Sequence, residues 1–177
     1  FNESGKSTLT IQGVTFDPLT NRISQQKEMI WGAELNGDVK LSRSFTLAGL
    51  LAYREGRYDA DGDGRLDSFL PNNRIATPLR AVLSGIWQFE EGTMLRVEAV
   101  GFTGRNQRID RQGTRYKIED GGTINLAVST PVLGGQAFAS VDNLFDTGYQ
   151  NPTATSVRNL PVEAFGRTVT FGYRKTF

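Results

Sequence analysis

The segment Phe45-Thr46-Leu47-Ala48-Gly49-Leu50-Leu51-Ala52-Tyr53-Arg54 decides the fold class. At alternate positions it separates an apolar set (Phe45, Leu47, Gly49, Leu51 and Tyr53) from a second set (Thr46, Ala48, Leu50, Ala52 and Arg54). A period of two places successive side chains on opposite faces of a β-strand. The segment is therefore predicted to be a strand with one apolar face and one face that also carries polar groups.

The same alternation recurs and predicts eight strands. Residues 79–90 and 94–101 have an apolar set that consists of Leu79, Ala81, Leu83, Gly85, Trp87, Phe89, Leu95, Val97, Ala99 and Gly101. The last run, residues 168–177, places Val169, Phe171, Tyr173 and Phe177 on one face, with Lys175 as the exception. The other predicted strands are residues 9–16, 29–35, 45–54, 123–129 and 137–144.

The connections alternate between long polar segments and short turns. Residues 17–28, 58–76, 106–121 and 143–165 are long, whereas residues 38–43, 89–92 and 130–135 are short. Outer-membrane barrels have short periplasmic turns and long extracellular loops. The order favours an all-β fold, an antiparallel transmembrane β-barrel. The alternative is a soluble antiparallel β-protein, in which the apolar faces pack a core.

Composition excludes several classes of function. The chain has no histidine and no cysteine, so the usual general base and a thiol nucleophile are both missing, and we expect no enzyme. Twenty basic and nineteen acidic residues are spread without a basic stripe, and nucleic acid is not expected as a partner. The chain begins at Phe1 without a signal peptide, which predicts a piece of a longer mature protein.

Three segments carry a resemblance to a known family. Trp31-Gly32-Ala33-Glu34-Leu35 is similar to a recurrent G-x-E-L strand start. The run Asn143, Leu144, Phe145 and Asp146, followed by Tyr149, resembles an N-L-F-D-x-x-Y segment of a penultimate strand. Gly166 and Arg167 match the P-G-R start of a last strand, with Phe165 in place of proline. With the strand rhythm between these segments, the whole chain resembles the C-terminal part of the barrel of TonB-dependent outer-membrane receptors of the siderophore type.

The resemblance implies a barrel of about 22 strands, of which residues 1–177 form about eight C-terminal strands. The N-terminal plug domain and the energy-coupling segment are absent from this chain. The implied function is uptake of a ferric siderophore or similar chelated nutrient across the outer membrane of a Gram-negative bacterium. The implied partners are that nutrient, the inner-membrane TonB complex through the absent N-terminal part, outer-membrane lipids with lipopolysaccharide, and the barrel-assembly machinery. Val169, Phe171, Tyr173 and Phe177 resemble the signal that this machinery recognises.

Two alternatives remain open at this point. Eight strands are enough to close a small barrel, so a stand-alone eight-stranded outer-membrane barrel is one of them. The other is a calcium-binding structural or adhesive β-domain. Because these residues contain no imidazole, we prefer a siderophore to haem as the nutrient.

One segment suggests a metal site. Asp59, Asp61, Asp63 and Asp67 occupy positions 1, 3, 5 and 9 of a loop whose sixth residue is Gly64, which resembles a calcium loop. Position 12 is Leu70, so the bidentate glutamate of an EF-hand is missing and weak binding is expected. The alternative is a solvated acidic loop that binds no ion. No cofactor is required, and calcium is the candidate.

Charged residues at polar positions of the strands are predicted to face the barrel lumen, namely Glu34, Arg54, Arg80, Arg96, Glu98, Asp142 and Arg174. In one long loop, Arg105, Arg108, Arg111 and Arg115 are candidates to contact an anionic chelate or lipopolysaccharide phosphates. No ligand contact is assigned to any one of them.

Overall fold

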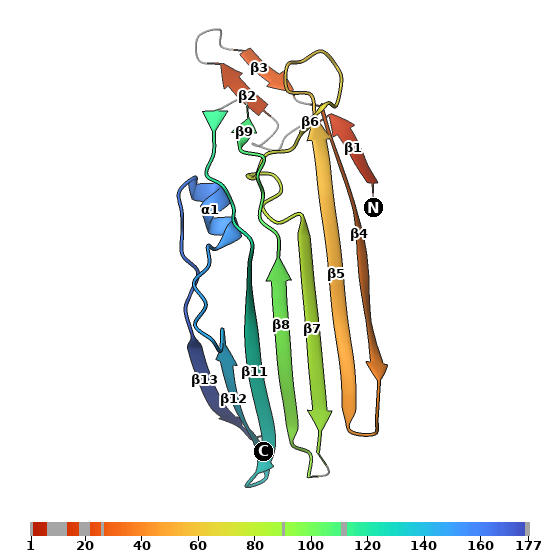
Figure 1. Cartoon of the computed structure of the whole chain (residues 1–177), viewed down its shortest axis with the longest axis vertical. Helices are drawn as coiled ribbons and strands as arrows, with labels where there is room; N and C mark the ends of the chain where they lie inside the picture. The colour runs from red at the N-terminus through yellow and green to blue at the C-terminus, as the bar shows by residue number, and fades with distance from the viewer. Residues whose placement is uncertain are drawn as a thin grey trace.

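The structure, a computed structural model, describes residues 2–6, 14–17, 22–25, 27–89, 91–110 and 113–175. Its main feature is an antiparallel nine-stranded sheet in the order β1-β4-β5-β7-β8-β11-β12-β13, with β6 paired to β5 (Figure 1). The strands of this sheet are β1 (Asn2–Lys6), β4 (Lys27–Lys40), β5 (Phe45–Tyr58), β6 (Ser68–Phe69), β7 (Leu79–Gln88), β8 (Met94–Phe102), β11 (Gly121–Val132), β12 (Gly135–Asp142) and β13 (Thr168–Arg174).

Two strand pairs and one helix of the described part lie outside this sheet. Strands β2 (Val14–Asp17) and β3 (Arg22–Gln25) pair with each other, as do β9 (Ile109–Asp110) and β10 (Gly113–Thr114). Helix α1 spans Pro152–Arg158. Among the described residues, no helix has the length and apolar character needed to cross a membrane.

The connections divide between the two ends of the sheet as predicted. Figure 1 shows short turns at the lower end, after β4, β7 and β11, and long connections at the upper end. The turn between β11 and β12 consists of Leu133 (φ 51°) and Gly134 (φ 73°), the two positive φ values of a type I′ hairpin. The β5–β7, β8–β11 and β12–β13 loops are long, and we call this end of the sheet the long-loop end.

The strand register aligns apolar residues into rows. One row crosses seven strands through directly opposed pairs: Val39, Leu47, Gly85, Val97, Leu126, Val141 and Val169. The adjacent row, one residue along each strand, contains Asp38, Ala48, Ser84, Glu98 and Asn125. Because opposed residues share a face of the sheet, one face is apolar and the other, the polar face, carries the charges.

The buried hydrophobic residues of the described part lie at one end of the sheet and not in its middle. Tyr58, Leu70, Ile75 and Ile118 are buried, and all four belong to the long-loop end. On the apolar face, by contrast, Leu35 is 72% exposed and Leu83 is 53% exposed. A soluble sandwich would bury this face in its core, whereas the residues that the structure describes leave it largely uncovered.

The first predicted strand, residues 9–16, is a strand over its described residues 14–16, but it is not part of the main sheet. The strand beside β4 is β1, and Val14–Asp17 pairs instead with Arg22–Gln25. A local hairpin costs less loop-closure entropy than a long-range pairing, and the intervening sequence contains Pro18 and Asn21, which favour a turn. Residues 9–13 lie outside the described part. Helix α1, within the predicted loop 143–165, was not expected.

Candidate functional site

A buried ion pair organises the long-loop end. Arg105 is 5% exposed, and its Nη1 lies 2.5 Å from Glu55 Oε2. Its Nε donates to the carbonyl oxygen of Leu70 at 3.1 Å, and Nη2 donates to the same oxygen. Arg105 thereby joins the β8–β11 loop to the β5–β7 loop. We predicted from the sequence that Arg105 is a candidate to contact an anionic ligand. The carboxylate of Glu55, however, already neutralises the charge of its guanidinium.

A small apolar cluster lies beside this pair, which we call the loop core. Tyr58, Leu70 and Ile75 form it, and Ile30 and Ala60 pack against it. Gly56 is required there, because a Cβ at this position would come within 2.4 Å of Leu70 Cδ1 and 2.8 Å of the carbonyl oxygen of Met29. Arg74 and Glu28 form a second ion pair nearby, with side chains 11% and 17% exposed.

Hydrogen bonds join all three long loops. Arg115 Nε donates to Asn72 Oδ1 at 3.2 Å, and Arg115 Nη2 donates to the carbonyl oxygen of Ser156 at 2.6 Å. The backbone N–H of Tyr116 donates to Asn159 Oδ1 at 2.9 Å. The β5–β7 loop, the β8–β11 loop and helix α1 are therefore one connected unit. Arg108 is exposed in the same loop, and Arg111 lies outside the described residues.

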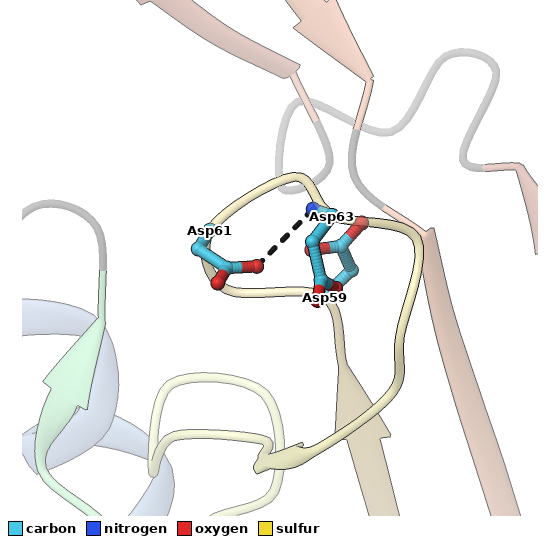
Figure 2. Close-up of side chains that lie close together, drawn as sticks. All are labelled: Asp59, Asp61 and Asp63. Carbon is cyan, nitrogen blue, oxygen red and sulfur yellow. Dashed lines mark hydrogen bonds between the residues drawn. The ribbon is translucent and has the colours of Figure 1, made fainter.

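The acidic loop, residues 59–67, follows the end of β5. Figure 2 shows Asp59, Asp61 and Asp63 gathered within one loop, and one carboxylate oxygen from each lies within 4.8 Å of the other two. Asp59 is 6% exposed and accepts from the N–H groups of Gly62 (2.6 Å) and Gly64 (2.8 Å). Asp61 Oδ1 accepts from the N–H of Asp63 at 3.1 Å.

The fourth predicted ligand is not part of this group. Asp67 Oδ1 accepts from the hydroxyl of Ser68 at 3.1 Å, and its carbonyl oxygen accepts from Arg57 Nη1. Lys27 Nζ donates to the carbonyl oxygen of Gly64 at 3.0 Å, which puts a positive charge beside the loop. The carboxylates fit a hard cation in chemical type, but the structure brings together three of the four proposed ligands.

The Asn143-Leu144-Phe145-Asp146 motif closes the start of the β12–β13 loop. Asn143 is 3% exposed with φ 53°. Its Oδ1 accepts from the N–H of Thr147 at 2.9 Å, and its Nδ2 donates to the carbonyl oxygen of Thr147 at 2.9 Å. The N–H of Asn143 donates to Asn125 Oδ1 at 3.0 Å, and the N–H of Leu144 donates to the carbonyl oxygen of Ile124 at 2.7 Å. The motif thus fastens β12 to β11.

The second half of the motif connects the two ends of that loop. Asp146 Oδ1 accepts from the N–H of Arg167 at 2.7 Å. A Cβ at Gly166 would lie 2.7 Å from the same Oδ1, so only glycine leaves room for this contact. The ring of Tyr149 lies 5.9 Å from that of Phe102 on β8. Phe145 is 68% exposed and takes no part in these contacts.

The predicted lumen-facing charges all lie on the polar face. The register places Glu34, Arg54, Arg80, Arg96, Glu98, Asp142 and Arg174 on the side opposite to the apolar row. Arg96 pairs with Glu98, and Ser84 donates to Glu98 at 3.1 Å. Glu34, Arg54 and Arg80 line a hollow of about 460 Å³ together with Thr77 and Pro78.

The predicted assembly signal lies on the apolar face as far as the structure describes it. Val169, Phe171 and Tyr173 are directly opposite Val141, Ala139 and Ala137. The Tyr173 hydroxyl lies 3.2 Å from the carbonyl oxygens of Val132 and Leu133. Phe177 lies outside the described residues.

The fold has a counterpart among solved structures. It is similar to the solved structure of an outer-membrane barrel, "Copper transporter OprC", with a TM-score of 0.67 over 89% of this chain and 21% sequence identity. The sheet is that of a β-barrel wall. The chain spans 25% of that transporter's length, and the low identity supports the shared fold alone. No protein-family model matches the sequence, and no curated protein matches it.

Proposed function

We propose that this chain is part of the wall of a TonB-dependent outer-membrane receptor that takes up a ferric siderophore or a similar chelated nutrient. The observation that carries the proposal is the pair of adjacent rows across the sheet, one apolar from Val39 to Val169 and one polar from Asp38 to Asn125. An apolar row on one face suits lipid, and charges on the other face suit an aqueous lumen.

Two further observations support this assignment. Strands β5, β7 and β8 contain 14, 10 and 9 residues, so each has at least the length of roughly 9–11 residues that a tilted strand needs to cross a bilayer. The N-L-F-D and G-R segments, which resemble the receptor family, are joined by the contact between Asp146 and Arg167. In this proposal the long-loop end is extracellular, the short turns are periplasmic, and no catalytic step is involved.

The likeness to a copper transporter raises copper as a competing nutrient. Copper favours imidazole, thiolate and thioether ligands. The chain has no histidine and no cysteine, and its two methionines, Met29 and Met94, lie at opposite ends of the sheet. These residues therefore supply no copper site, and we retain an iron chelate as the nutrient.

A stand-alone eight-stranded barrel is less well supported. In the described part of the chain, β1 pairs with β4 and β13 pairs with β12, so the sheet is open between these two edges. Unpaired edges in hydrocarbon are untenable, because each unsatisfied backbone group costs several kcal/mol. We propose that further strands of a wider barrel occupy both edges.

A calcium-binding role is the second candidate, favoured by the three clustered carboxylates of the acidic loop. We propose that such an ion would be structural, held by Asp59, Asp61 and Asp63. The exposure of Asp61 and Asp63 and the proximity of Lys27 favour weak binding.

Deletion of the gene in its host tests the receptor proposal. We expect uptake of radiolabelled iron supplied as a siderophore to fall to background and to return with a plasmid copy. In the complemented strain, an uncoupler of the proton-motive force should abolish uptake as well. Unchanged iron uptake with reduced copper uptake would identify copper, rather than an iron chelate, as the nutrient. Unchanged uptake of both, with no plug domain encoded upstream, would overturn the receptor assignment.

A further inference from the structure

Two arginines on the polar face are placed to act together. Arg80 on β7 is directly opposite Ala52 on β5, and the N–H of Arg54 donates to the carbonyl oxygen of Pro78 at 2.8 Å. Arg54 and Arg80 are therefore diagonal neighbours, with Cα atoms roughly 7–8 Å apart. Both side chains line the same hollow of about 460 Å³, a size suited to a small ligand.

These two arginines differ from the arginines of the long-loop end. Arg74 pairs with Glu28, and Arg105 pairs with Glu55, so both serve to hold loops. Among the residues that the structure describes, no carboxylate lies within 4.0 Å of the guanidinium of Arg54 or Arg80. Both are exposed. Two arginines that line one hollow, with no carboxylate at salt-bridge distance among the described residues, have the chemistry to bind one anion together.

The floor of the hollow beside Arg54 is formed by closely approaching backbone, with a glycine on the neighbouring strand. Gly32 is directly opposite Arg54, and a Cβ there would lie 2.5 Å from the carbonyl oxygen of Tyr53. Glu34, the third charged residue of the hollow, accepts from Asn36 Nδ2 at 3.2 Å on the β4 side. Its carboxylate opposes an anion but leaves the hollow with a net positive charge, and it restricts the anion to the β5–β7 side.

We propose that Arg54 and Arg80 form a binding subsite for an acidic group of the transported chelate, a catecholate or carboxylate oxygen pair that both guanidinium groups contact. This inference rests on the proposed function and deepens it, because it makes the nutrient anionic. A guanidinium fork binds two oxygens in parallel, which a lysine ammonium does not do.

Binding to the purified full-length receptor tests the subsite. The probes are an anionic ferric tris-catecholate and an uncharged ferric tris-hydroxamate, titrated against the wild type, R54Q, R80Q and R54Q/R80Q. Each single variant should bind the anionic probe about tenfold more weakly and the double variant roughly 100-fold more weakly, as expected for lost charge-assisted hydrogen bonds. R54K/R80K, which keeps the charge, should recover only part of the loss.

Two further variants control for charge. Arg43 and Arg174 lie at the short-turn end, so R43Q/R174Q removes the same charge and should bind the anionic probe as the wild type does. Glu34→Gln should change affinity in the opposite direction and strengthen binding of the anionic probe about threefold. Higher salt should weaken wild-type binding more than binding by R54Q/R80Q.

The possible outcomes separate the inference from the function on which it rests. A wild type that binds neither probe nor any chelate argues against the proposed function. A wild type that binds only the uncharged probe overturns the subsite and leaves the receptor intact. Unchanged anionic binding by R54Q/R80Q, or equal loss of both probes with a less heat-stable receptor, also overturns it; the second result would assign the arginines to contact with the plug.

Discussion

The guanidinium of Arg115 donates from Nη2 to the carbonyl oxygen of Ser156 at 2.6 Å, and so joins the β8–β11 loop to helix α1. The same side chain donates from Nε to Asn72 Oδ1 at 3.2 Å, and the N–H of Asn72 donates to the carbonyl oxygen of Gln107 at 3.0 Å. One arginine of the β8–β11 loop therefore contacts two other loops that are distant from it in sequence.

Replacement of Arg115 should separate these loops without unfolding the sheet. Arg115→Ala removes two hydrogen bonds from a cationic donor, each worth about 1.5–3 kcal/mol. We expect amide hydrogens of residues 152–159 and 70–75 to exchange faster, with no change in β7 or β8. Arg108→Ala, an exposed arginine of the same loop, is the control. Equal protection in both variants would contradict a connected loop unit.

The alternation of side chains predicted the sheet because, over their middle section, the strands carry apolar residues on one face and the charged residues on the other. The alternation is missing outside this middle section of the strands. Strand β1, Asn2–Lys6, pairs with the long-loop end of β4, where neither face has to be apolar, and its sequence Asn-Glu-Ser-Gly-Lys shows no alternation. Its position could not be predicted from hydrophobic periodicity.

Helix α1 had a local signal that the prediction did not use. Asn151 Oδ1 accepts from the N–H of Ala154 at 2.9 Å, Pro152 is the first helical residue, and Asn159 ends the helix at φ 53°. An asparagine before proline is a common helix start. The pair of Arg105 and Glu55 had no such signal, because 50 residues separate them and only the fold brings them together.

The contact between Asp146 and Gly166 predicts coupled effects of mutation. Asp146→Ala should destabilise the protein by about 1–3 kcal/mol, because it removes the acceptor for the N–H of Arg167. Gly166→Ala should do the same by displacing that carboxylate. The double variant should cost clearly less than the sum, measured as the midpoint of heat-modifiable unfolding in detergent. Additive losses would show that the two residues act independently.

Calcium binding remains a prediction. Asp61→Ala/Asp63→Ala removes two of the clustered carboxylates and keeps Asp59, whose oxygens hold the loop backbone. We expect the heat of calcium binding to the full-length protein to disappear in this variant. Asp67→Ala should retain it, because Asp67 lies outside the cluster. Identical titrations of the wild type and the double variant would identify a solvated acidic loop.

The orientation of the sheet can be tested with single cysteines, since this chain has none of its own. Arg65, Lys117 and Val157 are exposed at the long-loop end, whereas Arg43 and Glu91 are exposed at the short turns. Thr155, in helix α1 at the same end, is fully buried, so a cysteine at this position would not be accessible to the reagent. Cysteines at the first three positions should react with an impermeant maleimide on intact cells, and those at the last two only after lysis. The reverse labelling would invert the topology.

The apolar face offers the most decisive test of a membrane location, because adjacent residues of β7 face opposite environments. Leu83 lies on the apolar face opposite Gly49, and Val82 lies on the polar face opposite Leu50. In lipid, Leu83→Arg should lower the free energy of unfolding by about 2–4 kcal/mol if the residue lies near the midplane. An arginine at position 82 would instead lie on the polar face, toward the proposed lumen. We therefore expect Leu83→Arg to reduce the amount of heat-modifiable, folded protein in outer membranes, and Val82→Arg to leave most of it in place. In a soluble protein, by contrast, Leu83→Arg should fold normally, because Leu83 is 53% exposed and an arginine there would be solvated by water. Normal folding of Leu83→Arg would therefore contradict the lipid-facing assignment.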